Sequence, residues 1–464
     1  MKKSLLFLFI AVICLGMIYS SPCMANDVGN LIDKLVEKGI LSDSEALQLL
    51  QEAQKEDAKE KEELKQAAKD LVKEAGTDAF GIPEWIKRIK AGGDLRLRHD
   101  TQWRKTENDD YDRNRERFRI RLGIRAKVTD TTEIGVRLAS GSGYQNTTNQ
   151  SYDNHARGKE IFIDRAYASW KPYDFFKITG GKHKNSLFTS SLVWDSDINP
   201  EGFFEHLNFD IIDRVNIFSN LGQCFIEELN LKDSDRDPAL LIFQLGSIIK
   251  SFEKIKIELA GTYYNFKNLD ELEWKNGLLS NKTEFLGYNN NHSQQMIFSS
   301  DGKLLNQFKC LGFDAKIKIT QVLPMPFSIF GSYIYNKETD IEKLIENGVD
   351  PGDSDPDKLK SYAGDDRDSG WQVGISLGKK KKKGDWYVKY FYQELEDYAF
   401  PAAFVDSDFH GGGTNNKGHY IQLRYFLMDN IQARATGFFT GREDEDKDGQ
   451  KDEDRLQLDM VIKF

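Results

Sequence analysis

The sequence predicts an all-β membrane protein, a transmembrane antiparallel β-barrel of about sixteen strands, preceded by a short α-helical or coiled-coil periplasmic segment. Three observations predict this fold. Apolar and charged side chains alternate along many short segments, short and long connections take turns along the chain, and the last alternating segment ends in Phe464. Each barrel strand turns only every second residue to lipid, so a mean hydropathy of -0.57 is compatible with this fold.

The N-terminus carries the three parts of a secretory signal peptide. Two lysines precede an apolar stretch over residues 5–18, and a small-residue site ends at Ala25. We therefore expect residues 1–25 to be cleaved. A lipoprotein signal acylated at Cys23 is an alternative, but the residues before Cys23 lack the usual aliphatic side chain. A membrane anchor is excluded because the apolar stretch is shorter than the ~20 residues of a spanning helix.

Cleavage of the signal peptide sets the net charge of the mature chain and the cysteines that remain in it. The formal net charge of -10 becomes -12 after cleavage (-10 - 2), because residues 1–25 contain two lysines and no acid. An acidic protein with no basic surplus is not expected to bind nucleic acid. Cys224 and Cys310 remain after cleavage, and in an oxidising periplasm they either form a disulfide or stay as two isolated thiols.

Residues 26–76 have the composition of helices, residues 77–91 form a linker, and residues 92–464 form the barrel. The spacing at residues 42–45 is that of a capping box. Three leucines then follow at multiples of seven residues, namely Leu50, Leu64 and Leu71. We expect a short coiled coil that joins protomers, with a solvated helix or a plug against the barrel as the alternatives.

The clearest strand spans residues 114–128. Its apolar side chains share one parity, namely Phe118, Ile120, Leu122, Ile124, Ala126 and Val128. The basic side chains of residues 113–127 share the other, namely Arg113, Arg115, Arg117, Arg119, Arg121, Arg125 and Lys127. Only a strand puts these two sets on opposite faces, and in a membrane barrel they face lipid and lumen. A sheet that covers the core of a water-soluble protein is the alternative.

The connections give the strand number. Long polar stretches lie near residues 99–114, 141–159, 184–203, 222–238, 266–308, 337–368, 396–417 and 442–453, with short turns between them. Eight long loops alternating with short periplasmic turns imply about sixteen strands. The last segment alternates up to Phe464, which resembles the C-terminal signal read by the barrel-assembly machinery.

Several motifs carry a family resemblance. They are Gly-Asp-Leu-Arg-Leu-Arg at 93–98, the arginine-rich strand, Asp-Arg-Ala-Tyr at 164–167, Gly-Lys-His-Lys-Asn at 181–185 and Trp-Asp-Ser-Asp-Ile-Asn-Pro-Glu-Gly at 194–202. With them the chain resembles the bacterial putative porin family, Gram-negative outer-membrane β-barrel porins with an N-terminal helical extension. The resemblance covers most of residues 90–210 and the final strand, and it implies a channel without implying a solute.

The resemblance and the barrel pattern together set the expected function. We expect a water-filled channel in the bacterial outer membrane for passive diffusion of small hydrophilic solutes and ions, with a selective channel for anionic solutes as the alternative. The expected partners are outer-membrane lipid, lipopolysaccharide, the barrel-assembly machinery and further copies of the chain in a homotrimer.

The predicted lumen wall is mainly basic. Its pore-lining residues are Arg96, Arg98, Arg117, Arg119, Arg121, Arg137, Arg165, Lys316, Lys318, Lys389, Arg424 and Arg434. Three acids of the third long loop, Asp195, Asp197 and Glu201, are candidates to fold inward and face these arginines at a constriction. The alternative is that the three acids are solvated or bind cations held by lipopolysaccharide.

No cofactor is expected, with one possible exception at the last long loop. Asp444, Asp446 and Asp448 precede Gly449 with the spacing of a calcium loop, but Arg455 stands where the closing glutamate belongs. A flexible acidic loop is the alternative. An enzyme is not expected either, because an outer-membrane lipase needs a serine beside a histidine on the lipid face, and His419 has no such serine at its height on the strands predicted beside it.

Overall fold

The computed structural model describes residues 84–106, 110–143, 145–228, 236–251, 254–271, 306–320, 325–339, 367–443 and 450–464, together with Lys38, Leu304 and four residue pairs between 274 and 349. The chain divides into two units, Met1–Lys87 and Arg88–Phe464. The predicted signal peptide and nearly all of the predicted helical segment lie outside the described residues. No helix in the described part of the chain is long and apolar enough to cross a membrane.

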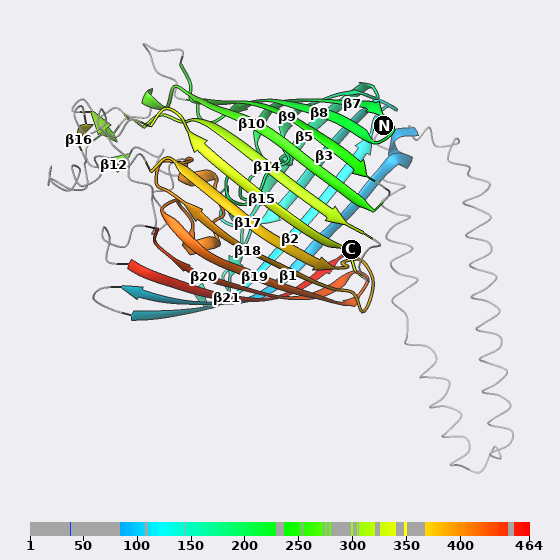
Figure 1. The fold of residues 1–464 in the computed structure, drawn as a ribbon. Helices are drawn as coiled ribbons and strands as arrows, with labels where there is room; N and C mark the ends of the chain where they lie inside the picture. The colour runs from blue at the N-terminus through cyan, green and yellow to red at the C-terminus, as the bar shows by residue number, and fades with distance from the viewer. Residues whose placement is uncertain are drawn as a thin grey trace. The chain divides into compact units, whose positions relative to one another are not determined.

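The second unit is a closed antiparallel barrel, and sixteen of its described strands form the wall (Figure 1). These are β1 (Ile89–Thr106), β2 (Asp110–Lys127), β3 (Thr132–Ser140), β5 (Ile161–Tyr173), β6 (Phe176–Lys182), β7 (Glu201–Ile212), β8 (Val215–Phe225), β9 (Ala239–Ser251), β10 (Ile255–Lys267), β14 (Lys309–Ile319), β15 (Phe327–Asn336), β17 (Ser369–Gly378), β18 (Trp386–Leu395), β19 (Asn416–Met428), β20 (Ile431–Gly441) and β21 (Gln450–Lys463). The predicted strand number is confirmed. The first strand begins at Ile89, inside the segment predicted as a linker.

The smaller elements lie in the connections. The short strand β4 (Gln150–Ser151) pairs with β2. The other short strands form two separate pairs, β11 (Trp274–Lys275) with β12 (Leu278–Leu279) and β13 (Phe298–Ser299) with β16 (Gly348–Val349). The 3-10 helices are η1 (Glu84–Arg88), η2 (Asn154–Ala156), η3 (Leu269–Glu271), η4 (Ala402–Phe404) and η5 (Phe409–Gly411).

The barrel closes where its last strand meets its first. β1 pairs with both β2 and β21, and the backbones of Gly93 and Phe464 exchange two hydrogen bonds of 2.8 and 3.1 Å. A Cβ atom at position 93 would lie 2.3 Å from the carbonyl oxygen of Arg121 and 2.8 Å from the Phe464 ring. Because glycine has no Cβ atom, Phe464 can pack directly over the seam at this position.

Antiparallel pairing sends the connections alternately to the two ends of the barrel. Residues 128–131, 174–175 and 213–214 are short turns at one end, which we call the short-turn end. The opposite end carries longer connections, among them loop 3 (residues 183–200) and loop 7 (residues 396–415).

The first long connection was predicted wrongly. Residues 99–114 were expected to be a loop, whereas β1 and β2 run through most of this stretch as paired strands of 18 residues each. Their inward-facing polar side chains bind one another, as the 2.6 Å contact between Arg115 Nη2 and Asp100 Oδ2 shows. The polarity of this stretch therefore reflects pairing inside the lumen rather than exposure to bulk water.

The outer face of the barrel is apolar. On β2, Leu122 and Ile124 are 45% and 55% exposed, whereas Arg119 on the other parity is 7% exposed. Many other outward side chains, such as Phe243, Phe313 and Leu423, are also large, apolar and exposed. Such a surface is stable against lipid and unfavourable in water.

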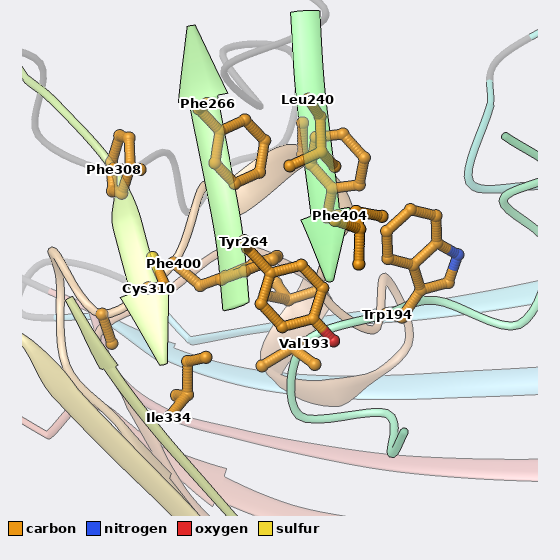
Figure 2. Packing of buried hydrophobic residues seen from close by; sticks show 14 of the residues in the cluster. Val193, Trp194, Leu240, Tyr264, Phe266, Phe308, Cys310, Ile334, Phe400 and Phe404 are labelled. Atoms are coloured by element: carbon orange, nitrogen blue, oxygen red, sulfur yellow. The ribbon is translucent and has the colours of Figure 1, made fainter. Parts of the chain in front are cut away.

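One side of the lumen is filled by apolar side chains rather than by water. Leu192, Val193 and Trp194 of loop 3 and Phe400 and Phe404 of loop 7 are buried there. They pack against inward-facing residues of the wall, namely Phe204, Cys224, Leu240, Ile242, Tyr264, Phe266, Cys310 and Ile334 (Figure 2). The two loops are thus held against β7–β10, β14 and β15, and we call this contact the apolar clamp.

Candidate functional site

The other side of the lumen is built from arginines on β1, β2 and β21 that share aspartates. Asp94 accepts hydrogen bonds from Arg119 Nη2 at 2.7 Å and Arg121 Nε at 2.8 Å. Asp94 lies opposite Arg121 in the register of β1 and β2, so the pairing follows from the strand alignment. One carboxylate therefore offsets part of the charge of two guanidinium groups.

A second buried network crosses the seam of the barrel. Asp100 Oδ1 and Oδ2 accept hydrogen bonds from Arg455 Nε and Nη2 at 2.7 and 2.8 Å. Asp459 binds Arg98 in the same two-pronged way, at 2.7 and 3.1 Å, and also lies 3.8 Å from Arg434. Such bidentate pairs fix both partners in orientation, which makes the wall rigid at the seam.

Loop 3 and loop 7 each bring an aspartate to these arginines. Asp197 Oδ1 lies 3.7 Å from Arg121 Nη1 and 3.9 Å from Arg119 Nη1. Asp408 lies 3.0 Å from Arg455 Nη1 and 3.3 Å from Arg98 Nη1. Burial alone would raise the pKa of Asp408, but Arg455 and Arg98 outweigh it and hold that pKa well below its usual range.

Asp195 joins the two loops to each other, and Asp406 of loop 7 lies close to it. Asp195 accepts the backbone N–H groups of Asp197 at 2.8 Å and Ser407 at 2.9 Å, and the Asp195 N–H donates to the Phe404 carbonyl at 2.6 Å. Burial, together with the neighbouring Asp406, raises the pKa of Asp195 above its usual range. Burial, together with Asp408, raises the pKa of Asp406 to about 6.

These groups surround a cavity of about 560 Å³, which we call the arginine cavity. Its cationic lining side chains are Arg96, Arg98, Arg119, Arg121, Arg137, Arg165, Lys184, Lys389, Arg424 and Arg434. Its acidic lining side chains are Asp195, Asp197, Asp406 and Asp408. Ten cations against four aspartates leave the lining basic, even after the wall aspartates behind it are included.

The basic lining continues toward the short-turn end. A middle cavity of about 290 Å³ shares Lys389 and Arg424 with the arginine cavity. A lysine cavity of about 470 Å³ shares Lys316, Ser376, Lys380 and Tyr387 with the middle cavity. The three cavities therefore adjoin one another in series along the inner wall.

Comparison with known proteins identifies the family. The family model described as "Putative porin" matches residues 100–302 and 278–464, which together span more than half of the chain. The chain belongs to this family. The protein therefore resides in the bacterial outer membrane, and its fold is that of an outer-membrane channel.

Solved porin structures resemble the chain at low sequence identity. OprB of Pseudomonas putida is 11% identical, covering 82% of this chain and 95% of its own, with a TM-score of 0.47. OmpF of Salmonella typhi is 8% identical (81% and 97% covered, TM-score 0.46), and the channel DcaP of Acinetobacter baumannii is 12% identical (81% and 97%, TM-score 0.42). No curated protein sequence matches the chain.

The structure of this porin places most predicted basic residues in the passage. Nine of them line the arginine cavity, namely Arg96, Arg98, Arg119, Arg121, Arg137, Arg165, Lys389, Arg424 and Arg434. Lys316 and Lys318 line the lysine cavity. Arg117 faces inward but lines none of the three cavities, and its Nη1 lies 3.7 Å from the buried Asp100.

The predicted constriction acids separate into two groups. Asp195 and Asp197 fold inward on loop 3, as described above. Glu201 does not join them: it begins β7 on the outward parity and pairs with Lys182 at 2.5 Å. The loop was expected to extend to residue 203, and the earlier start of the strand turns Glu201 away from the lumen.

Several residues of the site were not found from the sequence. Asp406 and Asp408 of loop 7 were missed because that loop was taken as a polar surface loop. Its apolar run at residues 399–405 could have signalled burial, since a solvated loop has no reason to carry it. The wall acids Asp94, Asp100 and Asp164 were also missed, because their partners are set by cross-strand register.

The remaining candidate sites have no counterpart in the passage. Cys224 and Cys310 are buried, free thiols, so the disulfide alternative does not hold. Asp444, Asp446 and Asp448 lie outside the described residues, and within the described ones no cluster of three or more potential ligands could hold a metal ion. His419 faces outward, with its Nδ1 2.9 Å from the Tyr390 hydroxyl and its ring beside Tyr392.

Proposed function

We propose that this porin is a water-filled channel for the passive diffusion of small hydrophilic solutes and ions, with a preference for anions. The observation that carries the proposal is the excess of cationic over acidic side chains along three adjoining cavities. Because the screening length is about 10 Å at 0.1 M salt, wall charge acts across a narrow aqueous passage.

The apolar clamp supports the small size of the expected solutes. It occupies one side of the lumen, so the passage is confined to the basic side. Apolar walls in a narrow lumen exclude water and ions, whereas guanidinium and ammonium groups attract anions. Solutes would therefore follow the arginine and lysine side chains from the long loops to the short-turn end, which is the periplasmic end in outer-membrane barrels.

Proteoliposome swelling tests the channel itself. Purified protein should make liposomes swell in isosmotic arabinose and more slowly, or not at all, in larger oligosaccharides. Protein-free liposomes are the control, and a heat-dependent shift in electrophoretic mobility verifies that the barrel is folded. Folded protein that admits no small sugar would contradict a water-filled channel.

A selective channel for anionic solutes is the second candidate. Arg96 and Arg165 favour it, because their nearest hydrogen-bonding partners are neutral: Arg96 donates to Asn149 and Arg165 donates to Asn199 at 2.8 Å. Neither forms an ion pair with an acid in the described residues. Saturable flux of a small organic anion, against linear flux of a neutral solute of the same size, would favour the selective channel.

The expected homotrimer is also part of the proposal. Removal of residues 27–75 would separate the two ways of holding protomers together, since these residues carry the predicted heptad leucines. An oligomer that survives in unheated samples of the truncated protein would assign assembly to the barrel wall.

A further inference from the structure

The lysine cavity differs from the arginine cavity in how its charges are balanced. The arginines of the wall share Asp94, Asp100 and Asp459, and Arg137 binds Asp164. Lys316, Lys318 and Lys380, by contrast, form no ion pair within the described part of the chain. Three lysines without an ion pair thus lie together near the short-turn end, whereas most of the wall arginines have an aspartate partner.

The acids nearest to these lysines are committed elsewhere. Asp385 accepts the backbone N–H groups of Lys381 and Lys382, each at 3.0 Å. Asp314 accepts a hydrogen bond from the Ser332 hydroxyl at 2.6 Å. Glu258, opposite Lys316 in the strand register, binds Lys256 at 2.7 Å.

Strand register builds a row of hydrogen-bond donors that runs from the lysine cavity into the adjoining middle cavity. Lys318 lies opposite Ser328, Ser328 opposite Ser376, and Ser376 opposite Lys389 across β14, β15, β17 and β18. All four face the lumen. Neighbouring strands are about 4.8 Å apart, so two hydroxyl groups lie between two ammonium-bearing strands about 14 Å apart. Neither serine hydroxyl has a hydrogen-bond partner among the described residues.

Lys380 completes the cavity from the turn between β17 and β18. Its Nζ lies 4.5 Å from the centre of the Tyr387 ring, and the Arg424 guanidinium lies 5.5 Å from the same ring. The Tyr387 ring therefore holds Lys380 at the lysine cavity and Arg424 at the adjoining middle cavity, although the two cations repel each other. This arrangement leaves their remaining N–H groups available to a ligand.

We propose that the lysine cavity is a binding site for a small oxyanion with two or more negative charges, such as phosphate or the phosphate group of a small organic molecule. Ammonium and hydroxyl groups at the site offer hydrogen-bond donors, which suits an anionic ligand whose oxygens are mainly acceptors. A multiply charged ion offsets several mutually repelling lysines at once, which chloride does not. The proposal rests on the proposed anion channel and adds a site to it.

Single-channel recording with inorganic phosphate as the probe tests the site. Phosphate added at the short-turn side should block the chloride current of the wild-type channel in a saturable manner. In the K316Q/K318Q/K380Q variant the half-blocking concentration should rise about tenfold or more, because three charged donors are lost. The S328A/S376A variant should show a smaller rise, since it removes only neutral donors.

The matched control is K171Q/K177Q/K250Q, which removes the same charge from residues near the short-turn end that do not line the cavity. Its half-blocking concentration should stay within about twofold of wild type. Calorimetric titration of phosphate into the detergent-solubilised barrel gives the same comparison without conduction.

Three outcomes separate the two proposals. Phosphate block that is equally strong in K316Q/K318Q/K380Q, or equally weakened in the control, overturns the site. A channel that prefers chloride but neither binds nor is blocked by phosphate also overturns the site, while the proposed channel stands. Folded protein without conductance contradicts the channel, and calorimetry with the same variants then decides the site.

Discussion

Weakening the apolar clamp should widen the passage without unfolding the barrel. Phe404 is 8% exposed, and its ring centre lies 5.2 Å from that of Trp194 and 5.6 Å from that of Phe266. Replacing a buried phenylalanine by alanine costs about 3–5 kcal/mol, through lost burial and the cavity left behind. None of this packing belongs to the strand ladder. Phe404→Ala should therefore leave the wall intact and release loop 7.

The size of the effect follows from the same estimate. Since 1.4 kcal/mol corresponds to a factor of ten in an equilibrium constant, a loss of about 3 kcal/mol raises the ratio of released to packed loop 7 by about a hundredfold. We expect larger and noisier single-channel currents and swelling in sugars too large for the wild-type channel.

Phe225→Ala is the control, because Phe225 is 63% exposed on the outer face. A folded Phe404→Ala barrel with wild-type current noise and size cut-off would refute the view that the clamp sets the bore.

Three further predictions follow. Asp406, with a pKa raised by burial to about 6, becomes neutral as the pH falls through that value. Anion preference should therefore increase between about pH 7.5 and about pH 5, and it should increase less in Asp406→Asn. The folded state binds the extra proton there, so loop 7 packing should also be more stable at the lower pH. Asp100→Asn should lower the free energy of unfolding in urea by about 3–5 kcal/mol, because it removes one partner of a buried pair, whereas Asp174→Asn at an exposed turn should not move the unfolding midpoint. Deleting Phe464 should reduce the amount of folded barrel in outer-membrane fractions, because the seam loses its contacts with Gly93; undiminished heat-modifiable protein would contradict this.

The wall of the barrel could be predicted from the sequence because a strand repeats every two residues. The parity of residues 114–128 alone separated the arginines from the apolar residues, and the structure puts them on opposite faces. The alternation of connections was also readable. The exception was the first connection, where the polar residues belong to two paired strands. The pattern alone cannot distinguish polar side chains that face the lumen from polar side chains that face bulk water.

The balance of charge could not be predicted in the same way. Arg119 and Arg121 were expected to line the lumen, and they do, but both also bind Asp94, a residue 25 or more positions earlier in the chain. Such pairs depend on which strands are neighbours and on their register. The lysine-rich turn illustrates the same limit, since its sequence gives no sign that Lys379, Lys380, Lys381 and Lys382 line a cavity of the lumen.

The apolar clamp left a partial signal in the sequence. Residues 239–243 are apolar on both parities, which is typical of a strand buried on both faces rather than one between lipid and water. The apolar run at residues 399–405 is the part of loop 7 that joins the same cluster. Which loop meets which strand, however, is decided only once the barrel closes.

The reversal potential of the wild-type channel in a potassium chloride gradient tests the central claim most directly. The cationic excess of the passage predicts a reversal potential of the sign given by preferential chloride flow. It should be largest when the dilute side is at about 0.1 M or below and should fade as salt shortens the screening length. A reversal potential of the opposite sign would mean that Asp195, Asp197, Asp406 and Asp408 control the passage, and it would contradict the account.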